Sequence, residues 1–241
     1  MRFKNLVTYK TKKTLLKATI IAFIFSMAIV QQQANAQQMF VDDAAVTTYR
    51  SFQVESWYGT EESWFLTAIS PFPALELGIG AGFDSGDLFD PLHWVFEAKI
   101  VPLDLEEDGW AYGMASGLLY DFDANLEEFF AYLLYSKMIF NDSSVLHLNL
   151  GWESVDEREG LGFEHGLVKG IRGDFGITER LTLLSEIAVM NFEDTFYQGG
   201  IRIGLVPGLL EMDITYGEGV RRMETAPGFN VGMAFTPDAL W

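Results

Sequence analysis

The sequence predicts an all-β fold: a closed antiparallel transmembrane β-barrel of about twelve strands. From Tyr49 to Trp241, apolar residues alternate with small or polar ones, and turns interrupt the alternation. The segment from Leu75 to Phe83 is the clearest, with Gly or Glu at every second position. Because successive side chains of a strand point to opposite faces, such a segment has one apolar and one polar face. Segments of about ten residues with this period, behind an export signal, are typical of outer-membrane barrels.

The first 36 residues are predicted to be that export signal. Arg2 and five lysines precede an apolar stretch at 18–30, and Ala34-Asn35-Ala36 offers the small residues that a signal peptidase accepts. The apolar stretch is shorter than the roughly 20 residues of a membrane helix, although a retained anchor helix is the alternative. Residues 37–241 are expected to form one barrel domain. With no Cys in the chain, neither disulfides nor a lipoprotein anchor are expected.

Twelve segments of the chain carry the alternation and are bounded by turn residues. Ten or fourteen strands are the alternatives if a hairpin has been merged or split. The expected strands lie near 49–58, 62–70, 74–84, 93–102, 109–119, 128–140, 144–153, 164–175, 180–191, 195–206, 209–217 and 228–236.

The connections between these segments alternate in length, which supports an even strand number. Short connections are expected at 71–73, 103–108, 141–143, 178–179 and 207–208. Longer connections rich in Asp, Glu and Gly are expected at 84–92, 121–127, 155–163 and 218–227. Outer-membrane barrels have short periplasmic turns and longer outside loops, so the rhythm also predicts the orientation, with both termini in the periplasm.

Aromatic residues near the predicted strand ends are expected to form girdles at the two membrane interfaces. These residues are Trp57, Tyr58, Trp64, Trp94, Trp110, Tyr112, Trp152 and Tyr197.

Charge excludes some partners and favours others. The chain has 16 Lys and Arg and 34 Asp and Glu, and six of the basic residues precede Gln37. The predicted mature chain thus has 10 basic and 34 acidic residues, a net charge of −24. Such a surface repels nucleic acid. The expected partners are outer-membrane lipid, the outer-membrane assembly machinery, and divalent cations at the acidic loops.

The alternation also divides the side chains into lipid-facing and lumen-facing sets. The phase of the strand at 164–175 is ambiguous, because one phase turns Lys169 toward lipid. The predicted lumen-lining residues are Glu76, Glu97, Lys99, His147, Arg172, Asp174, Glu186, Arg202, Glu211 and Asp213. Inward glycines suggest open space in a narrow lumen of mixed charge, with cations facing acids across it. Ion pairs that fill the lumen are the alternative.

Nothing in the spacing of the chemistry-bearing residues predicts an enzyme or a cofactor. The chain has three histidines, and a base requires a nucleophile or water and an orienting acid within reach. Scattered histidines without Cys make a poor transition-metal site. The run Asp84-Ser85-Gly86-Asp87 lacks the full spacing of a calcium loop, so a solvated acidic loop is preferred to a metal site.

The predicted mature chain resembles small outer-membrane barrel proteins of Gram-negative type. Val41-Asp42-Asp43-Ala44, followed by Gln53-Val54-Glu55-Ser56-Trp57 and the strand 75–83, is similar to the start of outer-membrane transporters associated with the meta-pathway of phenol degradation. That resemblance implies uptake of small, hydrophobic molecules by analogy of fold.

Three functions follow from these observations. The favoured one is a passive outer-membrane channel or transporter for small solutes. The second is a structural or adhesive barrel with a plugged lumen and acidic surface loops. The third is a barrel enzyme that acts on lipid.

Overall fold

The computed structural model describes residues 39–157, 162–190, 194–220 and 227–240. They form twelve antiparallel strands and one short helix, α2 (Leu105–Asp108). The predicted signal peptide lies outside the described residues. The strands are β1 (Phe52–Gly59), β2 (Glu62–Phe72), β3 (Leu75–Asp84), β4 (Asp87–Ile100), β5 (Trp110–Asp121), β6 (Leu126–Ile139), β7 (Ser144–Glu157), β8 (Gly162–Thr178), β9 (Leu181–Met190), β10 (Asp194–Val206), β11 (Leu210–Gly219) and β12 (Gly228–Phe235).

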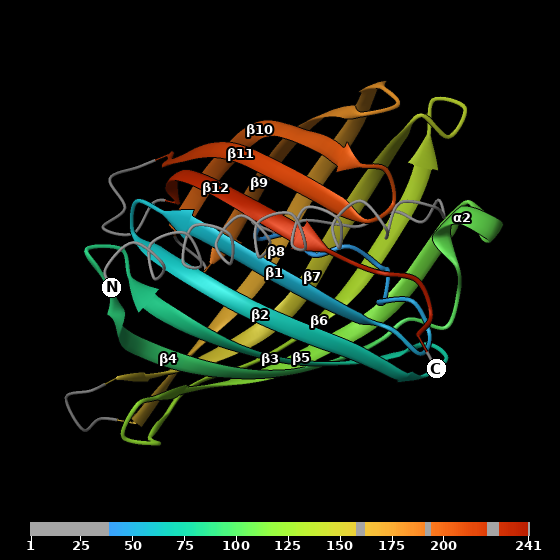
Figure 1. Ribbon diagram of the computed structural model, residues 1–241. Helices are drawn as coiled ribbons and strands as arrows, with labels where there is room; N and C mark the ends of the chain where they lie inside the picture. Colours follow the sequence, from blue (N-terminus) through green and yellow to red (C-terminus); the bar gives the residue numbers. More distant parts are fainter. Residues whose placement is uncertain (1–38, 158–161, 191–193, 221–226, 241) are drawn as a thin grey trace, which may run out of the picture. The chain divides into compact units, whose positions relative to one another are not determined.

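The sheet is a closed barrel in which each strand pairs with its neighbours in the sequence (Figure 1). β1 closes the barrel by pairing with β12, from Val54 opposite Phe235 to Gly59 opposite Asn230. Closure leaves no strand edge with unpaired backbone groups, which a sheet in lipid requires. The prediction of a closed, twelve-stranded, antiparallel all-β barrel is confirmed.

The connections differ from the prediction at two places. The expected loop at 84–92 is wrong, because β4 already begins at Asp87 and leaves a two-residue turn. Pro91 is tolerated in β4 because it pairs only with β3, and pairing with β5 starts at His93. The connection at 103–108 contains α2, whose first turn is capped by the Asp104 carboxylate, which accepts from the backbone N–H of Glu106 at 2.8 Å.

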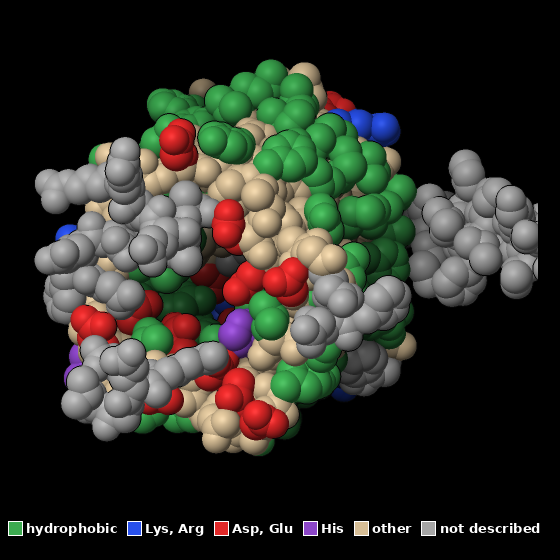
Figure 2. Space-filling model, turned by 90° about the vertical axis from the view of Figure 1, so that its left-hand side faces the viewer, with side chains coloured by type: hydrophobic (Ala, Val, Ile, Leu, Met, Phe, Trp, Pro, Cys, Tyr) green, Lys and Arg blue, Asp and Glu red, His purple; other side chains and the backbone are tan. Residues whose placement is uncertain are grey.

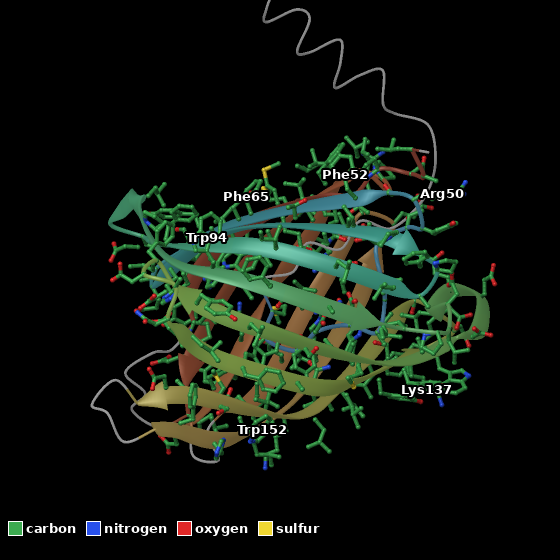
Figure 3. All side chains as sticks on the ribbon, turned by 90° about the horizontal axis from the view of Figure 1, so that it is seen from below. Arg50, Phe52, Phe65, Trp94, Lys137 and Trp152 are labelled. Carbon is green, nitrogen blue, oxygen red and sulfur yellow. The ribbon has the colours of Figure 1, made fainter. Side chains whose placement is uncertain are left out.

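The outer face of the barrel is largely apolar, and its exposed side chains alternate with buried ones along each strand. Phe65 of β2 and Trp152 of β7 lie on the outside of the ribbon (Figure 3). Lys169 also faces outward, so the ambiguous phase of β8 places Arg172 and Asp174 inside. Lys169 pairs with Val189, one residue before the end of β9. Its long side chain can therefore reach polar surroundings near that end of the barrel.

The expected aromatic girdles are incomplete. Six of the eight predicted girdle residues are exposed on the outer face: Tyr58, Trp94, Trp110, Tyr112, Trp152 and Tyr197. Trp57 and Trp64 instead line the lumen. In β1 and β2 these two positions have the same phase as the inward Glu55 and Leu66, so the strand period, and not nearness to the strand end, decides their direction.

Leu133 offers a test of the membrane-facing surface. It lies in the middle of β6 with 59% of its side chain exposed. We expect Leu133→Arg to lower the free energy of unfolding in lipid by roughly 2–4 kcal/mol, since a charge near the bilayer midplane is poorly solvated. Urea titration of the barrel in phospholipid vesicles measures the change. Phe140→Arg, in the turn after β6, is the matched control and is expected to have little effect; equal losses in both variants would contradict the assignment.

Candidate functional site

The lumen is crossed by the chain segment that precedes β1, residues 39–48, here called the lumen segment. Its backbone is held by inward side chains from five separate strands. The N–H groups of Phe40 and Val41 donate to the Glu186 carboxylate of β9 at 3.0 and 2.9 Å. The N–H of Asp42 donates to Asn149 Oδ1 of β7 at 2.7 Å, and Asn149 Nδ2 donates back to the Asp42 carbonyl at 2.9 Å.

The second half of the lumen segment is bound by side chains of β6 and β3. The N–H of Ala44 donates to Ser136 Oγ of β6 at 2.7 Å, and the N–H of Thr47 donates to Glu76 of β3 at 2.5 Å. Ala44 is fully buried in a small apolar cluster with Val101 and Leu134. A segment without strand pairing thus has its backbone groups satisfied by side chains, as a buried chain requires.

Charged contacts strengthen this attachment. Arg172 Nη1 donates to the Val41 carbonyl at 2.8 Å, and Lys99 Nζ lies 2.8 Å from Asp42 Oδ1 and 3.8 Å from Asp43 Oδ1. Tyr132 donates its hydroxyl to Asp42 at 3.2 Å. Hydrogen bonds to a charged group are stronger than neutral ones; the bond from Arg172 is buried, and those to Asp42 are partly buried.

Close packing also fits the segment to the wall. A Cβ atom added at Gly170 would lie 2.4 Å from Cγ2 of Val41, so only glycine permits this approach.

Beside the lumen segment, the predicted lumen residues of β7 to β11 other than Glu186 form one ion-pair network. Arg172 binds Asp174 through two parallel bonds of 2.7 Å, and Arg202 binds Asp213 through bonds of 2.9 and 2.8 Å. Arg202 also lies 3.6 Å from Asp174 and 3.4 Å from Glu211, which links the two pairs. Apart from the 3.6 Å contact of Arg202 with Asp174, these pairs join residues of one strand or of adjacent strands, as in the alternative of ion pairs that fill the lumen.

His147 belongs to the same network. Its Nδ1 lies 2.8 Å from Ser136 Oγ, and its Nε2 lies 3.7 Å from Asp174. Sequence spacing did not reveal this Ser–His–Asp contact, because Ser136 comes from the adjacent strand β6. Ser136 has 0% exposure and already accepts the N–H of Ala44, which leaves no room for a substrate.

All ten predicted lumen residues lie on the inner face of the barrel, but they fall into two groups on different strands. Seven belong to β7–β11 and surround the first residues of the lumen segment, while Glu76, Glu97 and Lys99 lie on β3 and β4. The sequence prediction missed Asp42 and Asp43, which are not on a strand. A usable signal was present: residues 39–48 lack alternation, yet carry two acids between the predicted export signal and the first strand.

On the side of the lumen segment toward the connections β1–β2 and β3–β4, the barrel holds a cavity of about 800 Å³. Residues of the lumen segment line it, as do Glu61, Asp84 and Pro227 near the strand ends. Figure 2 shows the end of the barrel hollowed, with Asp and Glu side chains gathered around the opening. The cavity therefore opens toward the end that the sequence assigns to the outside.

Aromatic rings line two walls of this cavity. Trp64 stacks on Trp57, with ring centroids 6.4 Å apart and planes at 29°, and on His93, at 6.2 Å and 12°. On β6, Phe130 stacks on Tyr132 at 5.8 Å and 19°.

Inward glycines make room for these rings. A Cβ at Gly82 would lie 2.8 Å from Trp64, and one at Gly117 would lie 2.3 Å from Phe130. At these two positions the space beside the glycine is therefore filled by a ring.

Among the described residues, no group of three or more His, Cys, Asp and Glu side chains is arranged to hold a metal ion. Within those same residues, no helix is long and apolar enough to cross a membrane.

Three solved structures show the same fold at low sequence identity. The chain matches a NanC porin with a TM-score of 0.58 and 9% identity, over 76% of this chain and 98% of that one. It matches a KdgM porin with a TM-score of 0.54 and 11% identity, over 77% and 98%. A KdgM porin in complex with disordered oligogalacturonate matches with a TM-score of 0.57 and 10% identity, over the same shares.

The fold is that of these porins. No protein-family model matches the chain, and no curated protein sequence is significantly similar to it. At such identities the likeness extends to the barrel and its topology. The resemblance to transporters of the phenol meta-pathway is not confirmed by these comparisons.

Proposed function

We propose that this protein is a passive outer-membrane channel for small solutes, narrowed by its own lumen segment. The observation that carries the proposal is the cavity of about 800 Å³ inside a closed barrel whose outer face is apolar. A polar interior within a lipid-facing barrel is the arrangement that outer-membrane channels use. The fold shared with the NanC and KdgM porins supports it.

A second candidate, a structural barrel with a plugged lumen, is favoured by the lumen segment itself. Five side chains from the wall bind the backbone of residues 40–47, and the two bonds to Glu186 and the pair with Asn149 are buried or nearly so. A plug held in this way would block passage. The two candidates therefore differ in whether the free space beside the lumen segment continues through the barrel.

Single-channel recording in planar bilayers separates the two candidates. We expect discrete conductance steps when the purified full-length protein is added in potassium chloride. Protein boiled in the same detergent is the control and is expected to give none. Absence of steps across several salts and small solutes would contradict the channel and leave the plugged barrel.

The remaining functional predictions belong to the same proposal. The protein would be exported by residues 1–36, inserted by the outer-membrane assembly machinery, and surrounded by outer-membrane lipid, with the acidic loops available to divalent cations. Uptake of small hydrophobic molecules, as the phenol meta-pathway resemblance implies, is one version of it. Catalysis is not part of it, because the Ser136–His147 pair is closed off by Ala44. A lipid-hydrolysis assay with His147→Ala as control tests that point.

A further inference from the structure

We propose that the cavity is a binding site for a small organic cation, one with an ammonium group on an aromatic or similarly apolar body. This names the solute class of the channel proposed above and rests on that function for its biological meaning. The binding itself can be measured without conduction.

The charge of the cavity lining is strongly one-sided. Ten of the lining residues are Asp or Glu, and Lys99 is the one Lys or Arg among the described lining residues. Lys99 is already engaged by Asp42 at 2.8 Å and by Asp43 at 3.8 Å. Carboxylates gathered between low-dielectric walls concentrate cations and exclude anions. A polyanion such as the oligogalacturonate of the KdgM complex would be repelled here.

Two of these carboxylates lack the partners that the rest of the lumen supplies. Near the lumen segment, Arg172 and Arg202 are each bonded to an acid. In the cavity, by contrast, Glu97 and Glu128 make neither a hydrogen bond nor an ion pair with any described residue, and meet other charges only at longer range. An inward carboxylate without a partner is costly, and a bound cation removes that cost.

The aromatic rings indicate which kind of cation fits. Trp57 and Trp64 line one wall of the cavity and stack on each other, Trp64 also stacks on His93, and Phe130 and Tyr132 form a stacked pair on β6. The face of an aromatic ring attracts an ammonium group and packs against apolar carbon at the same time. A small metal ion instead requires several oxygen ligands that converge on one point, and no such group occurs among the described residues. The combination therefore favours an organic cation over an inorganic one.

Calorimetric titration of the full-length protein, expressed with its signal and purified from membranes in detergent, tests the inference. The probe is benzyltrimethylammonium, compared with benzyl alcohol and benzoate at constant sodium chloride. We expect saturable binding of the cation, and binding at least about tenfold weaker for the neutral and anionic probes, as charge pairing in a partly desolvated site predicts.

Substitutions of cavity residues test whether the cation binds in the cavity. The double substitution E97Q and E128Q removes two carboxylate charges and is expected to weaken binding of the cation about tenfold or more. W57L removes an aromatic ring face and is expected to weaken it several-fold. E106Q, on the exposed helix α2, is the matched control and is expected to bind like the unchanged protein. Heat-dependent gel mobility verifies that each variant is folded.

Each outcome bears on a different statement. Equal binding of benzyl alcohol or benzoate, or unchanged affinity in the folded double variant, would overturn the cation site even if the protein conducts. Saturable binding of sodium ion alone in the same titration would also overturn it. Cation binding by a protein that shows no conductance would support the site while contradicting the channel.

Discussion

Deletion of residues 39–48, which joins the export signal region directly to Tyr49, is expected to raise the single-channel conductance several-fold. The physical reason is that the lumen segment occupies the interior between β3 and β9, where its backbone is bonded to Glu76 at one end and Glu186 at the other. Its removal leaves water in place of packed chain. Conductance in planar bilayers measures the effect, with the unchanged protein recorded at the same salt concentration.

A milder pair of variants makes this result interpretable. Asp42→Asn together with Asp43→Asn keeps the segment but removes its ion pairs with Lys99. We expect frequent transitions to the larger conductance, since the segment is loosened and not removed. Asp108→Asn, an exposed side chain at the end of α2 without a contact to Lys99, should leave the record unchanged. If the deleted protein folds, as judged by its heat-dependent gel mobility, and conducts no better than the full chain, the segment does not obstruct the lumen.

The barrel could be predicted from the sequence because strand alternation is a local property. Each strand needs only its own period to show which face is apolar, and the ends of β3 agree with the expected segment 74–84 to within one residue. The error at 84–92 has a local cause as well. The predicted connection contains Pro91, yet the end of β4 that pairs only with β3 does not need the missing N–H.

The content of the lumen could not be predicted, because it depends on contacts between distant residues. The alternation identifies Glu186 and Arg172 as inward, but their partners, the backbone groups of Phe40 and Val41, lie more than a hundred residues earlier in the chain. The phase of β8 illustrates the same limit. Lys169 on the outer face is explained only by its register beside Val189 near the end of β9.

Substitution of Arg172 is expected to produce the largest loss of stability within the barrel interior. Its side chain is 1% exposed, and it binds Asp174 through two bonds and the carbonyl of Val41 through a third. Arg172→Met leaves the Asp174 carboxylate buried with weaker compensation, chiefly Arg202 at 3.6 Å. Removal of one partner of a buried pair costs about 3–5 kcal/mol. Urea titration in phospholipid vesicles measures the change.

The double variant Arg172→Met with Asp174→Asn shows how much of the lost stability comes from leaving Asp174 without its partner. Since replacing both partners removes the uncompensated charge, we expect it to recover a large part of the lost stability, as is general for buried ion pairs. Lys169→Met, on the same strand but on the outer face, is the matched control and should change the free energy of unfolding little. A single variant as stable as that control would contradict the assignment, because Arg172 would then hold neither Asp174 nor the lumen segment. Loss of the bond to Val41 should also loosen the lumen segment, so the folded Arg172→Met protein is expected to show the larger conductance more often than the unchanged protein.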